Sequence, residues 1–79
     1  MPRFHLNIFS DIEAPDYEGI ERPDLNRVIA ETVTGVRDLV ASGIREGRPI
    51  YRSHRIEITD GAGTLLHAVY FGDVIDLRP

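Results

Sequence analysis

The chain has 79 residues, a formal net charge of −4, 42% hydrophobic residues and 28% charged residues. This composition is typical of a globular protein and excludes a disordered one. The chain contains no cysteine, which excludes a disulfide framework, a thiolate zinc site and a cysteine nucleophile. A chain this short buries only about 60% of the surface that it exposes when unfolded. We therefore expect a single domain over residues 1–79 that is supported by self-association.

The sequence carries no recognisable signal for secretion or membrane insertion. The opening residues Met1 to His5 lack a basic segment followed by an apolar core. No apolar run approaches the length of about 18 residues that a membrane-spanning helix needs. Together with the absence of cysteine, these features predict a soluble cytoplasmic protein without a membrane partner.

The N-terminal part of the chain predicts one strand, an acidic loop and a short edge strand. Apolar and polar residues alternate from Phe4 to Phe9, which is the pattern of a half-buried strand. The stretch from Ser10 to Glu18 is rich in acidic and turn-forming residues, and we expect a loop there. Gly19 to Glu21 is expected to add a short edge strand before Pro23.

A long amphipathic helix is the strongest signal in the chain, and its expected range is Leu25 to Glu46. Asp24 is suited to cap its N-terminus, and Gly47 followed by Pro49 ends it. Such a helix is ~33 Å long, whereas a strand of six or seven residues spans about 20 Å, so one helix end should extend past the sheet. Apolar residues recur at three- and four-residue steps. They are Leu25, Val28, Ile29, Val33, Val36, Leu39, Val40 and Ile44.

The C-terminal part predicts a hairpin. Arg55 to Thr59 alternates like a strand, the glycine-containing stretch from Asp60 to Gly63 forms the turn, and Leu65 to Phe71 returns as the second strand. We expect Leu65, Val69 and Phe71 on one face of this strand with His67 as a core histidine, and Leu66, Ala68 and Tyr70 on the other. The tail from Gly72 to Pro79 is expected to be irregular, with Val74, Ile75 and Leu77 as a final anchor.

These elements predict an α+β fold with two layers. A small antiparallel sheet of three or four strands carries one long amphipathic helix on one face, in the order β-(β)-α-β-β. One helix covers only about half of such a sheet. The residues on the uncovered face, Leu66, Ala68 and Tyr70, are therefore the expected interaction surface.

No catalytic, cofactor or metal site is expected from the sequence. His5, His54 and His67 lack the spacing of metal ligands. The acidic residues between Asp11 and Glu18 do not follow the pattern of a calcium loop. The chain also has no phosphate-binding glycine motif and no nucleophile elbow. These absences favour a non-catalytic protein.

Charge is unevenly distributed along the chain. Residues 1–24, 25–55 and 56–79 carry net charges of −4, +3 and −3. The cationic stretch contains Arg48, Arg52 and Arg55, which are the candidate anion-binding residues. Because the whole chain is acidic, nucleic acid is a disfavoured partner. A solvated surface is the simpler interpretation of these arginines, since cations are expected at the C-terminal end of a helix.

Three segments resemble a family of short bacterial proteins that is known only as a domain of unknown function. They are MPRFHLNIFSD, DYEGIERPDLNRVIAE and RIEITDGAGTLLHAVYFGD, and together they extend over nearly the whole chain. The resemblance rests on the Met-Pro-Arg-aromatic start, the Gly19, Glu21, Pro23 and Asp24 positions before the helix, and the Asp-x-x-Gly hairpin. Strand one lacks the family's usual aromatic pair, and His67 and Tyr70 replace more common residues. The resemblance implies a strand-helix-hairpin fold and no assigned activity.

The sequence therefore leaves two functions to compare. The first is a protein-interaction module that forms a homodimer or binds an unlike protein. The alternative is a regulatory module that binds an anion or nucleic acid through Arg48, Arg52 and Arg55. Salt separates the two, because phosphate contacts weaken as salt rises, whereas apolar association persists.

Overall fold

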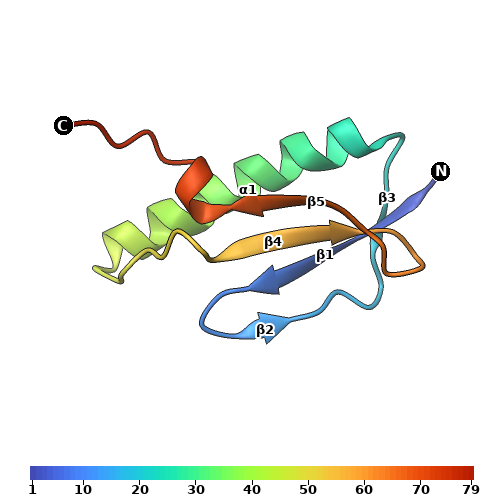
Figure 1. Ribbon diagram of the computed structural model, residues 1–79, viewed down its shortest axis with the longest axis horizontal. Coiled ribbons are helices and arrows are strands. Elements are labelled where there is room, and N and C mark those ends of the chain that lie inside the picture. The colour runs from blue at the N-terminus through green and yellow to red at the C-terminus, as the bar shows by residue number, and fades with distance from the viewer.

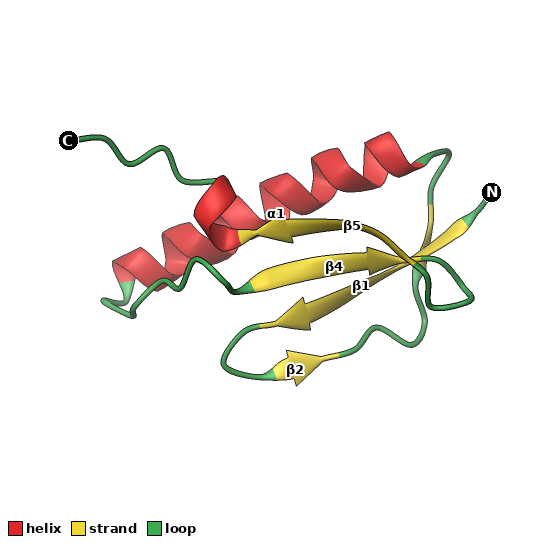
Figure 2. Ribbon diagram, viewed as in Figure 1, coloured by secondary structure: helices red, strands yellow, loops and turns green.

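A computed structural model describes residues 1–79 and shows one helix packed on a small, open antiparallel sheet (Figures 1 and 2). The α+β arrangement predicted from the sequence is confirmed. In chain order the elements are β1 (Arg3–Phe9), β2 (Glu13–Ala14), β3 (Ile20–Glu21), α1 (Leu25–Arg45), β4 (Arg55–Thr59), β5 (Leu65–Tyr70) and the short 3-10 helix η1 (Phe71–Asp73).

The strands lie in the order β2-β1-β4-β5, with β3 added to the other end of β1. Figure 1 shows β5, β4, β1 and β2 side by side, with the C-terminal tail leaving the sheet after η1. In the central pair, Leu6 lies opposite Ile58 and Ile8 lies opposite Ile56. This register places the apolar residues of both strands on the face that α1 covers.

The structure adds a strand that the sequence analysis treated as loop. The amide of Ser10 donates to the carbonyl of Ile12 at 3.0 Å, and this tight turn folds the chain back onto β1. The two residues of β2 then pair with Ile8 and Phe9. Their sequence, Glu13-Ala14, has no strand pattern, because pairing this short depends on the turn before it rather than on apolar alternation.

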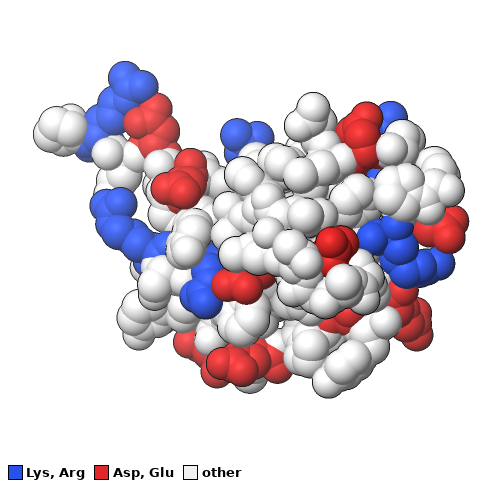
Figure 3. Space-filling model, turned by 45° about the vertical axis from the view of Figure 1, so that its right-hand side comes forward, with Lys and Arg blue, Asp and Glu red and all other residues white.

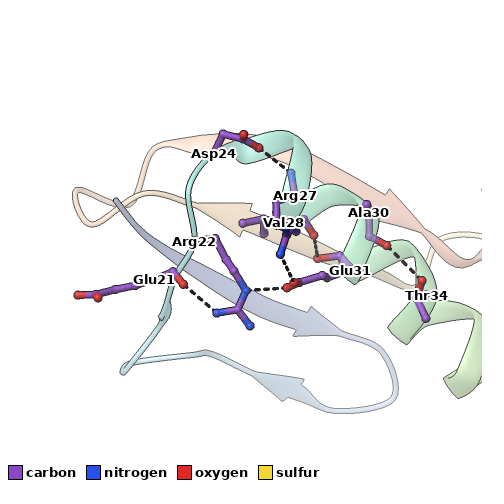
Figure 4. A network of polar contacts seen from close by, with 9 residues as sticks. Glu21, Arg22, Asp24, Arg27, Val28, Ala30, Glu31 and Thr34 are labelled. Carbon is purple, nitrogen blue, oxygen red and sulfur yellow. Dashed lines mark hydrogen bonds and ion pairs between the residues drawn. The ribbon is translucent and has the colours of Figure 1, made fainter. Parts of the chain in front are cut away.

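The helix begins and ends close to its predicted limits. Asp24 caps its N-terminus, and its Oδ1 accepts a hydrogen bond from the amide of Arg27 at 2.8 Å (Figure 4). Glu46 is the C-cap rather than the last helical residue. Gly47 follows with a φ of +73° and donates to the carbonyl of Ile44, which is the left-handed termination that glycine favours.

The core lies between α1 and the two strands β4 and β5. Val36 and Val40 pack with residues of the hairpin and η1, and Val28 packs with residues nearer the start of β1. Figure 1 shows the C-terminal turns of α1 extending past the start of β4, and Ile44 in that region is 62% exposed. The core residues contributed by the sheet and η1 are Phe4, Ile56, Ile58, Val69 and Phe71.

Two expectations about β5 are wrong. His67 is exposed rather than part of the core, and Leu65 is 55% exposed rather than packed with Val69 and Phe71. His67 pairs with Ile58, but Leu65 already pairs with Thr59, so Leu66 is an extra residue with no partner on β4. This β-bulge shifts Leu65 out of the alternation. His67 keeps the inward register but lies on an edge strand that α1 does not cover at this point.

The tail follows the expectation only in part. Val74 and Ile75 are half-buried against the core, whereas Leu77 is 83% exposed and anchors nothing. The predicted last strand also stops one residue early, because Phe71 begins η1. No helix in the structure combines the length and apolar character needed to cross a membrane.

Candidate interaction surfaces

One edge of the sheet consists of two very short strands, which together cover β1. Strand β1 pairs with β2 at one end and with β3 at the other. Between them, Asp16 takes the place of a strand: its Oδ2 accepts from the amide of Leu6 at 3.1 Å, and its Oδ1 accepts from the amide of Gly19 at 3.0 Å. The backbone of Asp16 adds two contacts: its amide donates to Asn7 Oδ1, and its carbonyl accepts from His5 Nδ1.

The environment of Asp16 favours its ionised form. Partial burial acts to raise the pKa of this carboxyl, but hydrogen bonds from the amides of Gly19 and Leu6 and the charge of His5 outweigh it. The net pKa lies below the ordinary value, because hydrogen bonds donated to a carboxylate stabilise its charged form. Asp16 is therefore a structural residue that holds the loop from β2 to β3 against β1.

The other edge of the sheet is open. The amide of Phe71 donates to the carbonyl of His54 at 2.8 Å, and these residues continue the β4–β5 register by one position. In an antiparallel ladder, residue pairs that exchange hydrogen bonds alternate with pairs that do not. It follows that His67 and Val69 bond to β4, while the peptide groups of Ala68 and Tyr70 point away from it. No strand lies on that side.

The three predicted interface residues occupy two kinds of position on β5. Ala68 and Tyr70 share the outer face of the sheet, opposite Glu57 and Arg55, and Leu66 is the unpaired bulge residue. Tyr70 is 39% exposed and Leu66 37%. Ala68 and Tyr70 both lie at the open edge of the sheet, because β5 is the outermost strand. The sequence does not reveal the strand order, so it could not identify this edge.

Tyr70 belongs to a row of three side chains that crosses neighbouring strands, and the sequence pattern does not reveal this row. The guanidinium carbon of Arg55 lies 4.7 Å from the ring centroid of Phe9 and 5.9 Å from that of Tyr70. Arg55 Nε also donates to Glu57 Oε2 at 2.7 Å, and this hydrogen bond raises the pKa of the guanidinium. The row arises from the pairing of β1, β4 and β5, which places three distant residues next to one another on one face.

The three candidate anion-binding arginines lie in three different environments. Arg48 donates to Glu46 at 2.7 Å, Arg55 is held in the aromatic row, and Arg52 packs against Gly72 beside a hollow that Ile50 and Ile75 line. Figure 3 shows arginine side chains (blue) spread over the face in view, with acidic side chains (red) beside several of them. Nothing in these contacts gathers the three guanidinium groups around one anion.

A groove of about 220 Å³ lies between the C-terminal half of α1 and the β1–β2 hairpin. Its apolar lining includes Ile12, which is 70% exposed, and Leu39, which is 45% exposed. Leu39 belongs to the apolar stripe of the helix but lines this groove and remains partly exposed. His54 Nε2 and Asp11 Oδ1 face each other there at 3.8 Å.

Two histidines of the chain take part in packing and hydrogen bonds. No group of three or more His, Asp or Glu side chains lies close enough to hold a metal ion. His5 is engaged by the carbonyl of Asp16 at 2.8 Å. The ring of His54 packs beside Tyr51, at 4.8 Å between centroids, and edge-on to Phe71, at 5.8 Å. These contacts explain both histidines as parts of the packing.

The fold and surfaces together define a small α+β domain whose open sheet has two very short strands at one edge and the six-residue strand β5 at the other. The family described as Domain of unknown function (DUF6894) matches residues 3–72. The chain belongs to this family, and the match confirms the resemblance seen in its motifs. No curated protein and no solved structure matches the chain.

Proposed function

We propose that the chain is a non-catalytic protein-interaction module that self-associates, and that a second copy binds at the open edge of β5. The observation that carries this proposal is the outward direction of the peptide groups of Ala68 and Tyr70, which have no strand partner. Unpaired N–H and C=O groups on an edge strand are a template for pairing with another chain.

The composition of β5 supports the proposal. Proteins usually protect an edge strand with lysine, proline or inward-pointing charged residues. The sequence of β5, Leu-Leu-His-Ala-Val-Tyr, has none of these, and its one protective feature is the bulge at Leu66. At the opposite edge, β2, Asp16 and β3 cover β1, and the two strands left outermost are only two residues long, which is a usual protection of an edge. The longer, less protected strand β5 is therefore the favoured edge for association.

The small core adds a reason for association. Of the 79 residues, 10 are buried, and the chain has no disulfide to support them. Domains of this size often gain stability from oligomerisation. Pairing at β5 would also cover part of an apolar side chain on this strand, that of Tyr70, which is 39% exposed.

The first test is the molar mass in solution, measured by light scattering over a concentration series at low and high salt. A dimer near 17.8 kDa, twice the chain mass of 8.9 kDa, is expected at both salt concentrations. Backbone pairing and apolar contacts do not weaken with salt in the way that phosphate contacts do. A monomer at all concentrations contradicts the proposal.

Two variants locate the contact. Ala68→Pro removes an outward-pointing N–H but no bond to β4, so it should abolish the dimer while the fold remains. His67→Glu places a charge at the edge, on a side chain that is already exposed, and should weaken the dimer at least tenfold. Ala41→Glu, on the exposed side of α1, is the matched control and should leave the dimer unchanged. If all three variants dimerise equally, the contact lies elsewhere.

A further inference from the structure

We propose that two copies pair their β5 strands antiparallel, with Val69 on the two-fold axis and Ala68 opposite Tyr70 of the second copy. This inference rests on the proposed self-association and specifies its geometry. Such a contact uses the same surface of both copies, and closes after two chains. It would join the two sheets into one continuous sheet.

The hydrogen-bonding pattern between β4 and β5 limits the registers in which a second β5 strand can pair. The hydrogen bond from Phe71 to His54 fixes Ala68 and Tyr70 as the residues whose peptide groups point outward. A second β5 strand can form reciprocal hydrogen bonds only where its own outward-pointing residues lie opposite these two. With two-fold symmetry, three registers meet this condition: Ala68 opposite Ala68, Ala68 opposite Tyr70, and Tyr70 opposite Tyr70.

The register with Ala68 opposite Tyr70 makes the most complete set of bonds. The Ala68–Tyr70 pair occurs twice in this register, once on each side of the axis. Each pair exchanges two hydrogen bonds, so the interface has about four N–H···O bonds. The register with Ala68 opposite itself brings Tyr70 opposite Leu66, but Leu66 is the bulge residue and lies outside the regular alternation. The register with Tyr70 opposite itself brings Ala68 opposite Gly72, which lies in η1 rather than in a strand.

The side chains fit the same register. On the outer face, the large ring of Tyr70 would lie beside the methyl group of Ala68 of the second copy, and the row of Phe9, Arg55 and Tyr70 would continue across the interface. On the inner face, the two Val69 side chains would meet at the axis. A large residue thus faces a small one on one face, and apolar contacts form on the other.

Disulfide trapping tests this register directly, because the chain has no cysteine of its own. Val69→Cys, Ala68→Cys and Tyr70→Cys are prepared separately, oxidised under mild conditions and compared on non-reducing gels. At the axis, Val69 and its symmetry mate form a non-hydrogen-bonded pair with Cα atoms about 4.5 Å apart, which suits a disulfide. The two Ala68 residues would be diagonal neighbours, roughly 7–8 Å apart.

The expected result is that Val69→Cys forms the cross-linked dimer at least tenfold faster than the other two variants. Ala62→Cys, in the exposed hairpin turn, is the control for random collision. Faster cross-linking by Ala68→Cys or Tyr70→Cys overturns the register but keeps the proposed self-association. A monomeric wild-type chain in light scattering overturns both.

A second measurement avoids substitution of the buried Val69. Isotope-labelled and unlabelled wild-type chains are mixed, and nuclear Overhauser effects between the two kinds of chain are recorded. A contact between the Tyr70 ring of one chain and the Ala68 methyl group of the other is expected. An intermolecular contact between the two Ala68 methyl groups, without the Tyr70–Ala68 contact, overturns the register.

Discussion

The carboxylate of Asp16 accepts a hydrogen bond from the amide of Leu6 at 3.1 Å, at the stretch of β1 where neither β2 nor β3 pairs. A single side chain thus completes the edge of a strand. Its other oxygen binds the amide of Gly19, so the same residue also shapes the turn that leads to β3. The contrast between β1, which is covered along its length, and β5, which has no strand on its outer side, is the basis of the proposed function.

Replacing Asp16 should destabilise the fold in a pH-dependent way. We expect Asp16→Asn to lower the free energy of unfolding at pH 7 by about 1–3 kcal/mol, since charge-assisted hydrogen bonds to two amides are weakened. The pKa of Asp16 in the folded chain lies below its ordinary value of 3.8. The stabilisation is therefore present above that value and is lost as the pH falls through the folded-state pKa.

Urea unfolding of Asp16→Asn and the wild type at pH 7 and pH 3 measures this effect. The difference between the two proteins should be smaller at pH 3, where part of the carboxyl population is protonated in the unfolded chain. Asp38→Asn, on the exposed side of α1, is the matched control and should show little change at either pH. An equal loss in Asp16→Asn and Asp38→Asn contradicts the role given to Asp16.

Two glycines of α1 should respond differently to alanine. A Cβ at Gly35 would meet nothing within 4 Å, so Gly35→Ala should raise the free energy of unfolding by about 0.5–1 kcal/mol. A Cβ at Gly43 would lie 2.9 Å from Cδ1 of Ile50, so the same gain is offset by displacement of that side chain. Denaturant unfolding checks both, and equal stabilisation would show that Ile50 does not pack against Gly43.

Asp24 should contribute to stability through its cap. We expect Asp24→Ala to lower the free energy of unfolding by about 1 kcal/mol, because the amide of Arg27 loses its acceptor. Asp24→Asn keeps an acceptor at this position and should retain most of the stability. Thermal unfolding followed by circular dichroism distinguishes the variants, and a loss in Asp24→Asn as large as in Asp24→Ala contradicts the capping role.

Substitutions at Ile58 and Leu65 should affect stability differently, although the alternation in both strands predicts an inward side chain at each position. The β-bulge is the reason for the difference. Ile58 is fully buried, and Ile58→Val should destabilise the fold by about 0.5–1.5 kcal/mol. Leu65 is 55% exposed, and Leu65→Val should change the stability of the monomer by less than about 0.5 kcal/mol. Both are measured by urea unfolding at a concentration low enough to keep the chain monomeric. A larger loss at Leu65 would mean that it packs in the core.

The sequence by itself determined the elements whose signals are local. The helix from Leu25 and its Asp24 cap follow from side-chain periodicity and hydrogen-bonding chemistry within a few residues. The alternation that predicts β1 and β4 is equally local. Each of these elements has one apolar face, which must be buried against another element. One amphipathic helix together with half-buried strands therefore defines the α+β class.

Only the tertiary structure decided what depends on neighbours far apart in the chain. The strand order left β5 at the edge, so His67 is exposed although its alternation points it inward. Pairing between strands set the bulge at Leu66 and joined Phe9, Arg55 and Tyr70 into one row. The folded chain also gives Arg48, Arg52 and Arg55 three different sets of contacts, although they are close in sequence. The burial of a residue depends on all its neighbours in space. The sequence pattern contains only its neighbours along the chain.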